Sequence, residues 1–170
     1  MYMLILVVCL TALDQYSKFL VSKHLAFGES LPLIPGLFSF THTRNTGAAW
    51  GMFHDFNGPL VILSIAITIC LIVFRKTMTG HSAAGRVAFS FMIAGILGNL
   101  ADRLRLGFVV DFFDVFRGAT HFPTFNVADS CICIGVGLYV LYAFLSGRKF
   151  TDDGTPAADK DTAAAGGSQT

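Results

Sequence analysis

The residues best suited to chemistry in this sequence are aspartates in apolar surroundings. Asp111 lies within the mostly apolar stretch 108–117, and Asp129 lies at the start of a long apolar segment. An ionised acid costs about 2.5 to 3.5 kcal/mol at the centre of a bilayer, so an acid within or beside an apolar span invites a functional explanation. Five aspartates are candidates on this ground: Asp14, Asp102, Asp111, Asp114 and Asp129.

Two such carboxylates could together hydrolyse an amide. When they face each other in a pocket of low dielectric they share a proton, so the pair has one raised and one lowered apparent pKa. The ionised member can take a proton from water while the protonated member polarises a peptide carbonyl, without a metal or a covalent intermediate. Spacing alone does not decide whether Asp111 or Asp114 would partner Asp129.

Two of the aspartates have a structural explanation in their sequence neighbours. Asp14 and Lys18 stand four apart in the order that favours an ion pair along a helix, and Asp102 stands beside Arg103. We therefore expect mainly structural roles for Asp14 and Asp102.

Asp129 has no basic residue nearby in the sequence. It stands three residues after Asn126, so the two side chains share one face of a helix. An acid in a first turn can simply stabilise the helix dipole, by about 0.3 to 1 kcal/mol. Asp111, another unpaired acid in an apolar stretch, favours a functional explanation instead.

No metal or cofactor site is indicated. The four cysteines and five histidines have no metal-ligand spacing, and no nucleotide-binding or metalloprotease motif occurs. We expect the cysteines, which lie in apolar runs, to be buried and inert.

The composition is that of a membrane protein. Of 170 residues, 54% are hydrophobic and 14% are charged, and the mean hydropathy is +0.63. A small water-soluble fold could not hide that much apolar surface, so lipid must cover much of it. A net charge of +1 with scattered basic residues excludes an electrostatic footprint for nucleic acid.

Four apolar segments predict membrane-spanning helices: residues 1–13, 59–74, 83–101 and 125–145. Residues 53–56 can lengthen the second. Ala94 and Gly98 in the third stand four apart, a spacing that lets helices approach closely. Four alternating crossings place both termini at one face, and the candidate aspartates with both long connections at the other.

The connections differ in their expected structure. Residues 37–43 follow a Pro35-Gly36 turn and read as a short extramembrane strand or hairpin. Residues 108–117 could lie in the membrane interface as a helix or as a strand.

The sequence also predicts the domain organisation. Residues 1–150 form a single domain, and the tail 151–170 has too few apolar residues to fold. Lysine and arginine divide evenly between the two faces, so counting them does not decide the orientation.

Five short motifs with polar residues are spread between residues 14 and 130. In order they are Asp14-Gln15-Tyr16-Ser17-Lys18, Asn45-Thr46-Gly47-Ala48-Ala49-Trp50-Gly51, Gly98-Asn99-Leu100-Ala101-Asp102-Arg103-Leu104, Gly107-Phe108-Val109-Val110-Asp111-Phe112 and Phe125-Asn126-Val127-Ala128-Asp129-Ser130. In type and order this series resembles the lipoprotein signal peptidases, the type II signal peptidases of bacteria.

The resemblance implies an all-α membrane protein: a four-transmembrane-helix bundle with a small extracytoplasmic β-cradle and an interfacial segment between helices 3 and 4. The implied activity is that of a membrane-embedded aspartic endopeptidase without a cofactor. Its substrates would be diacylglyceryl-modified prolipoproteins, cut just before the lipidated cysteine. It would be a monomer in the bacterial inner membrane, with cytoplasmic termini and the active site near the extracytoplasmic face.

The resemblance also assigns residues. Asp111 and Asp129 match the family's catalytic aspartates, whereas Asp114 falls outside the motif. The remaining matches are polar or glycine positions expected to orient the pair, the substrate or one another: Asp14, Lys18, Asn45, Gly47, Asn99, Asp102, Arg103 and Asn126.

Two other classes of membrane protein are alternatives to a peptidase. A proton- or cation-coupled transporter would spread its acids across the membrane depth. A structural scaffold would need packing glycines but leaves Asp129 unexplained. Here the acids gather at one face, which favours chemistry at a membrane surface.

Overall fold

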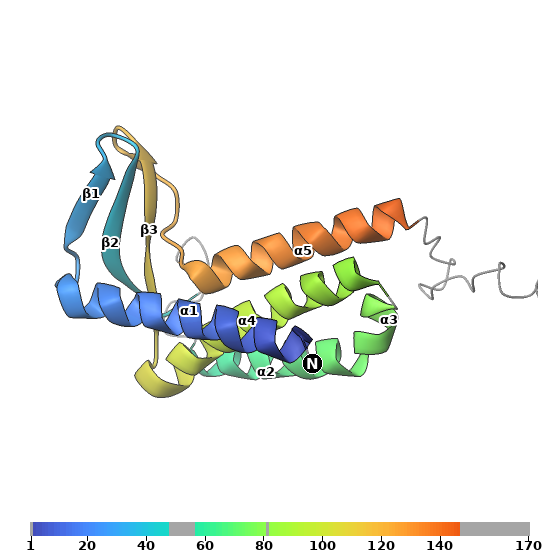
Figure 1. Cartoon of the computed structure of the whole chain (residues 1–170). Coiled ribbons are helices and arrows are strands. Elements are labelled where there is room, and N and C mark those ends of the chain that lie inside the picture. Colours follow the sequence, from blue (N-terminus) through green and yellow to red (C-terminus); the bar gives the residue numbers. More distant parts are fainter. Residues whose placement is uncertain (1, 48–56, 81, 147–170) are drawn as a thin grey trace, which may run out of the picture.

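The computed structural model describes residues 2–47, 57–80 and 82–146. Residues 53–56, predicted to lengthen the second span, and the tail 151–170 lie outside them. The helices are α1 (Tyr2–His24), α2 (Asn57–Val73), α3 (Arg75–Thr79), α4 (Ala83–Leu106) and α5 (Val127–Leu145), and the strands are β1 (Ser30–Ile34), β2 (Phe38–Asn45), β3 (Val109–Arg117) and β4 (Thr120–His121). The helices run alongside one another, and the sheet stands at one end of them (Figure 1).

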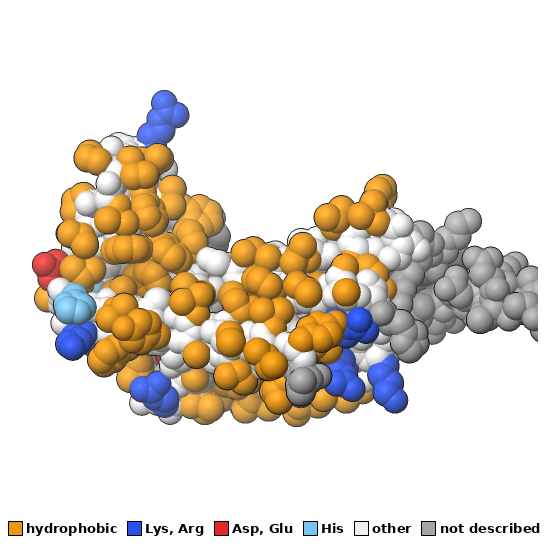
Figure 2. Space-filling view, in the orientation of Figure 1, with side chains coloured by type: hydrophobic (Ala, Val, Ile, Leu, Met, Phe, Trp, Pro, Cys, Tyr) orange, Lys and Arg blue, Asp and Glu red, His pale blue; other side chains and the backbone are white. Residues whose placement is uncertain are grey.

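Helix α4 is the centre of the bundle. It packs against α1, α2 and α5, and its middle turns are buried, whereas the other long helices expose most of their apolar side chains. Of the described helices, α1, α4 and α5 are long and apolar enough to cross a membrane, and α2 is a shorter apolar helix. Because so many apolar side chains face outward (Figure 2), lipid must solvate the bundle.

The two long connections build one antiparallel sheet in the order β1-β2-β3-β4. The predicted hairpin is confirmed: β1 pairs with β2 across a turn in which Gly36 has a φ of +79°. The segment between the third and fourth spans, for which sequence left helix or strand open, is β3. It pairs with β2, which satisfies its backbone hydrogen-bonding groups, so the strand alternative is correct and the segment joins the same sheet as the hairpin.

Small residues let α4 approach its neighbours, as the Ala94/Gly98 spacing predicts. A Cβ on Gly98 would lie 2.5 Å from Asp14 Oδ2 and 3.1 Å from the Ala128 side chain. Gly98 therefore provides the space in which the Asp14 carboxylate of α1 packs against α4.

The prediction of four buried cysteines is wrong for three of them. Cys131 is buried, but Cys9, Cys70 and Cys133 are exposed on the surfaces of their helices. An apolar run in a membrane helix can face lipid as well as the protein interior, so apolar neighbours did not imply burial.

Candidate active site

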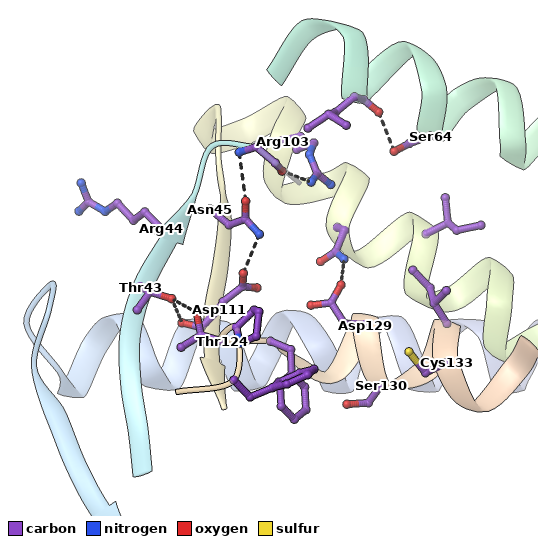
Figure 3. Close-up of a pocket in the computed structure, with 18 of the residues that line it drawn as sticks. Thr43, Arg44, Asn45, Ser64, Arg103, Asp111, Thr124, Asp129, Ser130 and Cys133 are labelled. Atoms are coloured by element: carbon purple, nitrogen blue, oxygen red, sulfur yellow. Dashed lines mark hydrogen bonds between the residues drawn. The ribbon is translucent and has the colours of Figure 1, made fainter. Parts of the chain in front are cut away.

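A pocket of about 1510 Å³ lies where the sheet meets the ends of α4 and α5. Asp111 from β3 and Asp129 from α5 both line it, together with Asn45 and Arg103, and Figure 3 shows these side chains in it. Its other wall is apolar and includes Leu63 and other side chains of α2 and α5. Two carboxylates and an extended apolar surface therefore line the same pocket.

Asp111 is almost fully enclosed, with 1% of its surface exposed. Its Oδ1 accepts a hydrogen bond from Asn126 Nδ2 at 2.6 Å, and its Oδ2 accepts one from Asn45 Nδ2 at 2.9 Å. Burial, helped by the nearby negative charge of Asp129, raises the pKa of Asp111 to about 7, although both amide hydrogen bonds act in the opposite direction. Near neutral pH this acid can therefore hold or release a proton.

Asp129 lies in the first turn of α5. Its Oδ2 accepts a hydrogen bond from the backbone N–H of Asn126, while Asn126 Oδ1 accepts one from the backbone N–H of Asp129, which makes a reciprocal capping box. Asn99 Nδ2 donates to Asp129 Oδ1 at 2.7 Å. Asp129 therefore has a structural role as part of a helix cap, and its carboxyl group also lines the pocket.

Asn126 connects the two carboxylates. Its side-chain amide reaches Asp111 while its backbone holds Asp129, and the residue is fully buried. In the part of the chain that is described, no hydrogen bond joins Asp111 directly to Asp129. The two acids therefore line one pocket at a separation fixed by a shared neighbour.

A buried ionic cluster centred on Lys18 stabilises this arrangement. Lys18 Nζ lies 2.9 Å from Asp14 Oδ2 and 3.1 Å from Asp102 Oδ2, and it donates to Asn99 Oδ1 at 2.9 Å. The expected pairing of Asp14 with Lys18 is present. The expected local pairing of Asp102 with Arg103 is wrong, because adjacent side chains of a helix point apart and Asp102 faces Lys18 on α1.

The acids of this cluster also bind the two elements that carry the candidate catalytic residues. Asp14 Oδ1 accepts a hydrogen bond from the backbone N–H of Ala128, next to Asp129. Asp102 Oδ2 accepts one from the backbone N–H of Val110, next to Asp111. The positions of β3 and α5 are thus fixed relative to α1 and α4.

Arg103 lines the side of the pocket that carries Asn45 and Gly47. Its Nη2 donates to the backbone carbonyl of Gly47 at 3.2 Å, and the Gly47 N–H donates to Asn45 Oδ1 at 3.0 Å. This chain of contacts orients the Asn45 amide toward Asp111. All ten residues that the resemblance assigned therefore lie in one connected region.

Asp114, the alternative to Asp111, is occupied elsewhere. Its Oδ2 accepts a hydrogen bond from Thr41 Oγ1 at 3.0 Å, and its Oδ1 lies 2.8 Å from His121 Nδ1. It lines the same pocket, but among the described residues its hydrogen bonds go to Thr41 and His121 and not to Asn126 or Asp129. Its contacts join β2, β3 and β4.

Three residues of the site were not predicted. Gln15 Nε2 donates to Asp14, to Asp102 and to the Gly98 carbonyl, and its position beside Asp14 in the first motif was the available signal. The hydroxyl groups of Thr43 and Thr124 contact each other at 2.8 Å beside Asp111. Their pairing depends on sheet contacts between distant segments, for which the sequence has no local signal.

Comparisons with known proteins agree on one family. The family model described as signal peptidase (SPase) II, Peptidase_A8, matches residues 6–145. The lipoprotein signal peptidase of Photorhabdus laumondii subsp. laumondii is 42% identical over 145 residues, covering 83% of this chain and 86% of that protein. That of Geobacter metallireducens is 41% identical over 145 residues, covering 83% and 89%. A solved bacterial membrane enzyme superposes with a TM-score of 0.79 at 34% identity, covering 89% of this chain and 93% of that one.

Proposed function

The chain belongs to the lipoprotein signal peptidase (SPase II, Peptidase_A8) family, and on that premise we propose that Asp111 and Asp129 are its catalytic pair. Membership makes it a multi-pass bacterial membrane enzyme, an aspartic peptidase that removes signal peptides from prolipoproteins. The observation that carries the assignment of the pair is the bonding of Asn126 to both carboxylates at one pocket.

The proposed reaction uses the two acids in different protonation states. Asp111, whose pKa is raised to about 7, holds the proton and donates a hydrogen bond to the scissile carbonyl oxygen. Because the pair shares one proton, Asp129 is then ionised, and it takes a proton from a water molecule while the water oxygen adds to the carbonyl carbon. Asp129 then gives this proton to the leaving nitrogen, the carbonyl forms again as the C–N bond breaks, and the products are a new carboxyl group and a new amine.

The eight supporting residues hold this pair in place. Asn45, Asn99 and Asn126 donate amide hydrogen bonds to the two carboxylates. Lys18 with its two acids fixes the backbone beside each catalytic residue. Gly47 and Arg103 orient Asn45, so catalysis depends on a scaffold assembled from distant segments: Asp14, Lys18, Asn45, Gly47, Asn99, Asp102, Arg103 and Asn126.

The proposed substrate carries diacylglycerol on the cysteine that follows the cleaved bond. The apolar wall of the pocket supports this, because it offers aliphatic side chains to acyl chains and to an apolar signal helix: Leu60, Leu63, Ile67 and Leu71 on α2, and Ile132 and Val136 on α5. Lipid would hold the scissile bond at the bilayer rim and so lower the entropy cost of positioning it.

We propose four membrane spans, including the shorter α2, with both termini in the cytoplasm and the site near the extracytoplasmic face of the inner membrane. The resemblance to the signal peptidase family supports this orientation, whereas the even division of lysine and arginine between the two faces does not decide it. The proposed working unit is a monomeric domain of residues 1–150, followed by a cytoplasmic tail of residues 151–170.

The experiment uses the purified enzyme with a prolipoprotein prepared with and without diacylglycerol. We expect cleavage of the lipidated form alone, and mass spectrometry should place the lipidated cysteine at the new amino terminus. Cleavage at another bond, or equal cleavage of both forms, would contradict the proposed substrate.

A further inference from the structure

An exposed arginine lies one side chain away from the buried ionic cluster. Arg105 stands in the last turn of α4, and its Nη1 donates to Gln15 Oε1 at 3.0 Å. Among the described residues, its guanidinium forms no other hydrogen bond and no ion pair. The polar contact of Arg105 with the rest of the molecule is therefore made through the Gln15 amide.

Gln15 connects this arginine to both acids of the cluster. Its Nε2 donates to Asp14 Oδ2 at 3.2 Å and to Asp102 Oδ1 at 3.0 Å, and the same nitrogen lies 3.0 Å from the Gly98 carbonyl oxygen. An amide nitrogen has two hydrogens to donate and does not accept, so three acceptors around it fix which end of the amide points inward. The carbonyl end then points outward, where Arg105 donates to it.

The cluster contains more negative than positive charge. Lys18 supplies one positive charge, whereas Asp14 and Asp102 are two carboxylates, and all three side chains are buried. A buried charge without a partner is costly, so the second carboxylate needs a further donor. The Gln15 amide supplies it. The Arg105 guanidinium at the other end makes this amide a stronger donor, because hydrogen bonds in a chain polarise one another.

The same two carboxylates hold the backbone beside each member of the proposed catalytic pair. Asp14 Oδ1 accepts from the Ala128 N–H at 2.9 Å, and Asp102 Oδ2 accepts from the Val110 N–H at 3.1 Å. In both acids Gln15 bonds to the oxygen that does not bind the backbone. Because a carboxylate is planar and rigid, fixing one oxygen also restricts the direction of the other.

We propose that Arg105 and Gln15 are positioning residues: the arginine, acting through the glutamine, balances the charge of the buried ionic cluster and so holds the catalytic pair in its working geometry. The effect on turnover rests on the proposed function of Asp111 and Asp129. Neither Arg105 nor Gln15 lines the active-site pocket, so substitutions there should lower kcat and leave KM unchanged.

The test is a double-mutant cycle in the full-length enzyme, assayed with a lipidated prolipoprotein. The variants are Gln15→Met, Arg105→Met and the two together, because methionine keeps an unbranched apolar stem without a charge or a strong hydrogen-bonding group. Arg105→Lys keeps a cation and a donor at the same position. Arg117→Met is the matched control, since Arg117 is an exposed arginine at the end of β3 and outside the pocket.

The expected effects differ between these variants. Gln15→Met should lower kcat about tenfold or more and Arg105→Met about threefold to tenfold, with KM within about twofold of the wild type. Arg105→Met should have no further effect in the Gln15→Met background. Arg105→Lys and Arg117→Met should both keep kcat within about twofold of the wild type. Thermal unfolding in detergent would confirm that each variant is folded at the assay temperature.

Several outcomes would overturn the proposal. They are an unchanged kcat in Arg105→Met, an equal loss in Arg105→Lys or Arg117→Met, a loss that appears as a rise in KM, and multiplication of the two single effects in the double variant. Turnover by both Asp111→Asn and Asp129→Asn would instead refute the catalytic pair, so the two failures are distinguishable. If Gln15→Met does not fold, the comparison of Arg105→Met with Arg105→Lys decides the question by itself.

Discussion

Asn126 donates a 2.6 Å hydrogen bond to Asp111 although fifteen residues separate them in the chain. The same asparagine caps α5 and holds Asp129 through its backbone. A single buried residue thus couples the start of a membrane helix to a strand of the sheet, and it sets the geometry of both carboxyl groups.

Replacing either member of the pair by asparagine should abolish proton transfer while preserving shape. We expect Asp111→Asn and Asp129→Asn each to lower kcat/KM by about 10² to 10⁴-fold for a lipidated prolipoprotein. The matched control is Asp114→Asn, because Asp114 contacts only Thr41 and His121 among the polar groups described here. Substantial turnover by both pair variants, or a loss in Asp114→Asn as large as theirs, would exclude the proposed assignment.

Asn126 should affect stability and activity through different atoms. Asn126→Ala removes the helix cap and leaves Asp111 Oδ1 without its amide donor, so we expect a loss of about 1 to 3 kcal/mol in unfolding free energy and of most activity. Asn126→Ser keeps an oxygen that can cap α5 but cannot supply the same amide. Thermal unfolding in detergent should therefore show recovery of stability in Asn126→Ser, while turnover stays low; parallel recovery of both would contradict this separation.

The pH dependence of activity should reflect Asp111. Because the proposed role requires its protonated form and its pKa is about 7, kcat/KM should fall as the pH rises through about 7. The hydrogen bond from Asn45 favours the ionised form, so Asn45→Ala should raise this pKa and move the fall to higher pH.

The control for this shift is Thr43→Val. Thr43 Oγ1 donates to the backbone carbonyl of Asp111 and does not touch the carboxyl group. The alkaline limb of Thr43→Val should therefore coincide with that of the wild type. A downward shift in Asn45→Ala would show that another group controls the limb.

The buried cluster around Lys18 should tolerate loss of charge poorly. Lys18→Met leaves Asp14 and Asp102 buried without a cation, and breaking a buried pair in this way costs about 3 to 5 kcal/mol. Asp14→Asn, which keeps an oxygen for the Ala128 N–H, should cost less. Folded yield and unfolding temperature would measure both effects, and equal stability of Lys18→Met and the wild type would show that the cluster contributes little.

Close helix packing predicts that substitution by alanine will affect stability differently at two glycines. Gly98→Ala would place a Cβ 2.5 Å from Asp14 Oδ2, and overpacking of this kind costs about 1 to 3 kcal/mol. In α5, a Cβ on Gly137 would meet no atom within 4 Å, so Gly137→Ala should be neutral or slightly stabilising. The unfolding temperatures of the two variants should differ in that order; a tolerated Gly98→Ala would show that Asp14 can move without cost.

Local patterns in the sequence were sufficient for several features of the fold. The apolar runs predicted the long helices, and the Pro35-Gly36 turn predicted the β1–β2 hairpin. These features depend on helical periodicity, hydrophobicity and turn chemistry, which act within a few residues. The five motifs were sufficient to indicate the family, since their order is itself a property of the sequence.

Contacts between distant segments required the tertiary structure. Residue spacing left Asp111 and Asp114 as alternatives, and it paired Asp102 with its neighbour Arg103. Only the pairing of β2 with β3 gives Asp114 its bond to Thr41, and only the packing of α1 on α4 brings Lys18 to Asp102. Sequence could indicate which polar groups need partners in a medium without water, but the close approach of separate elements decided which partners they have.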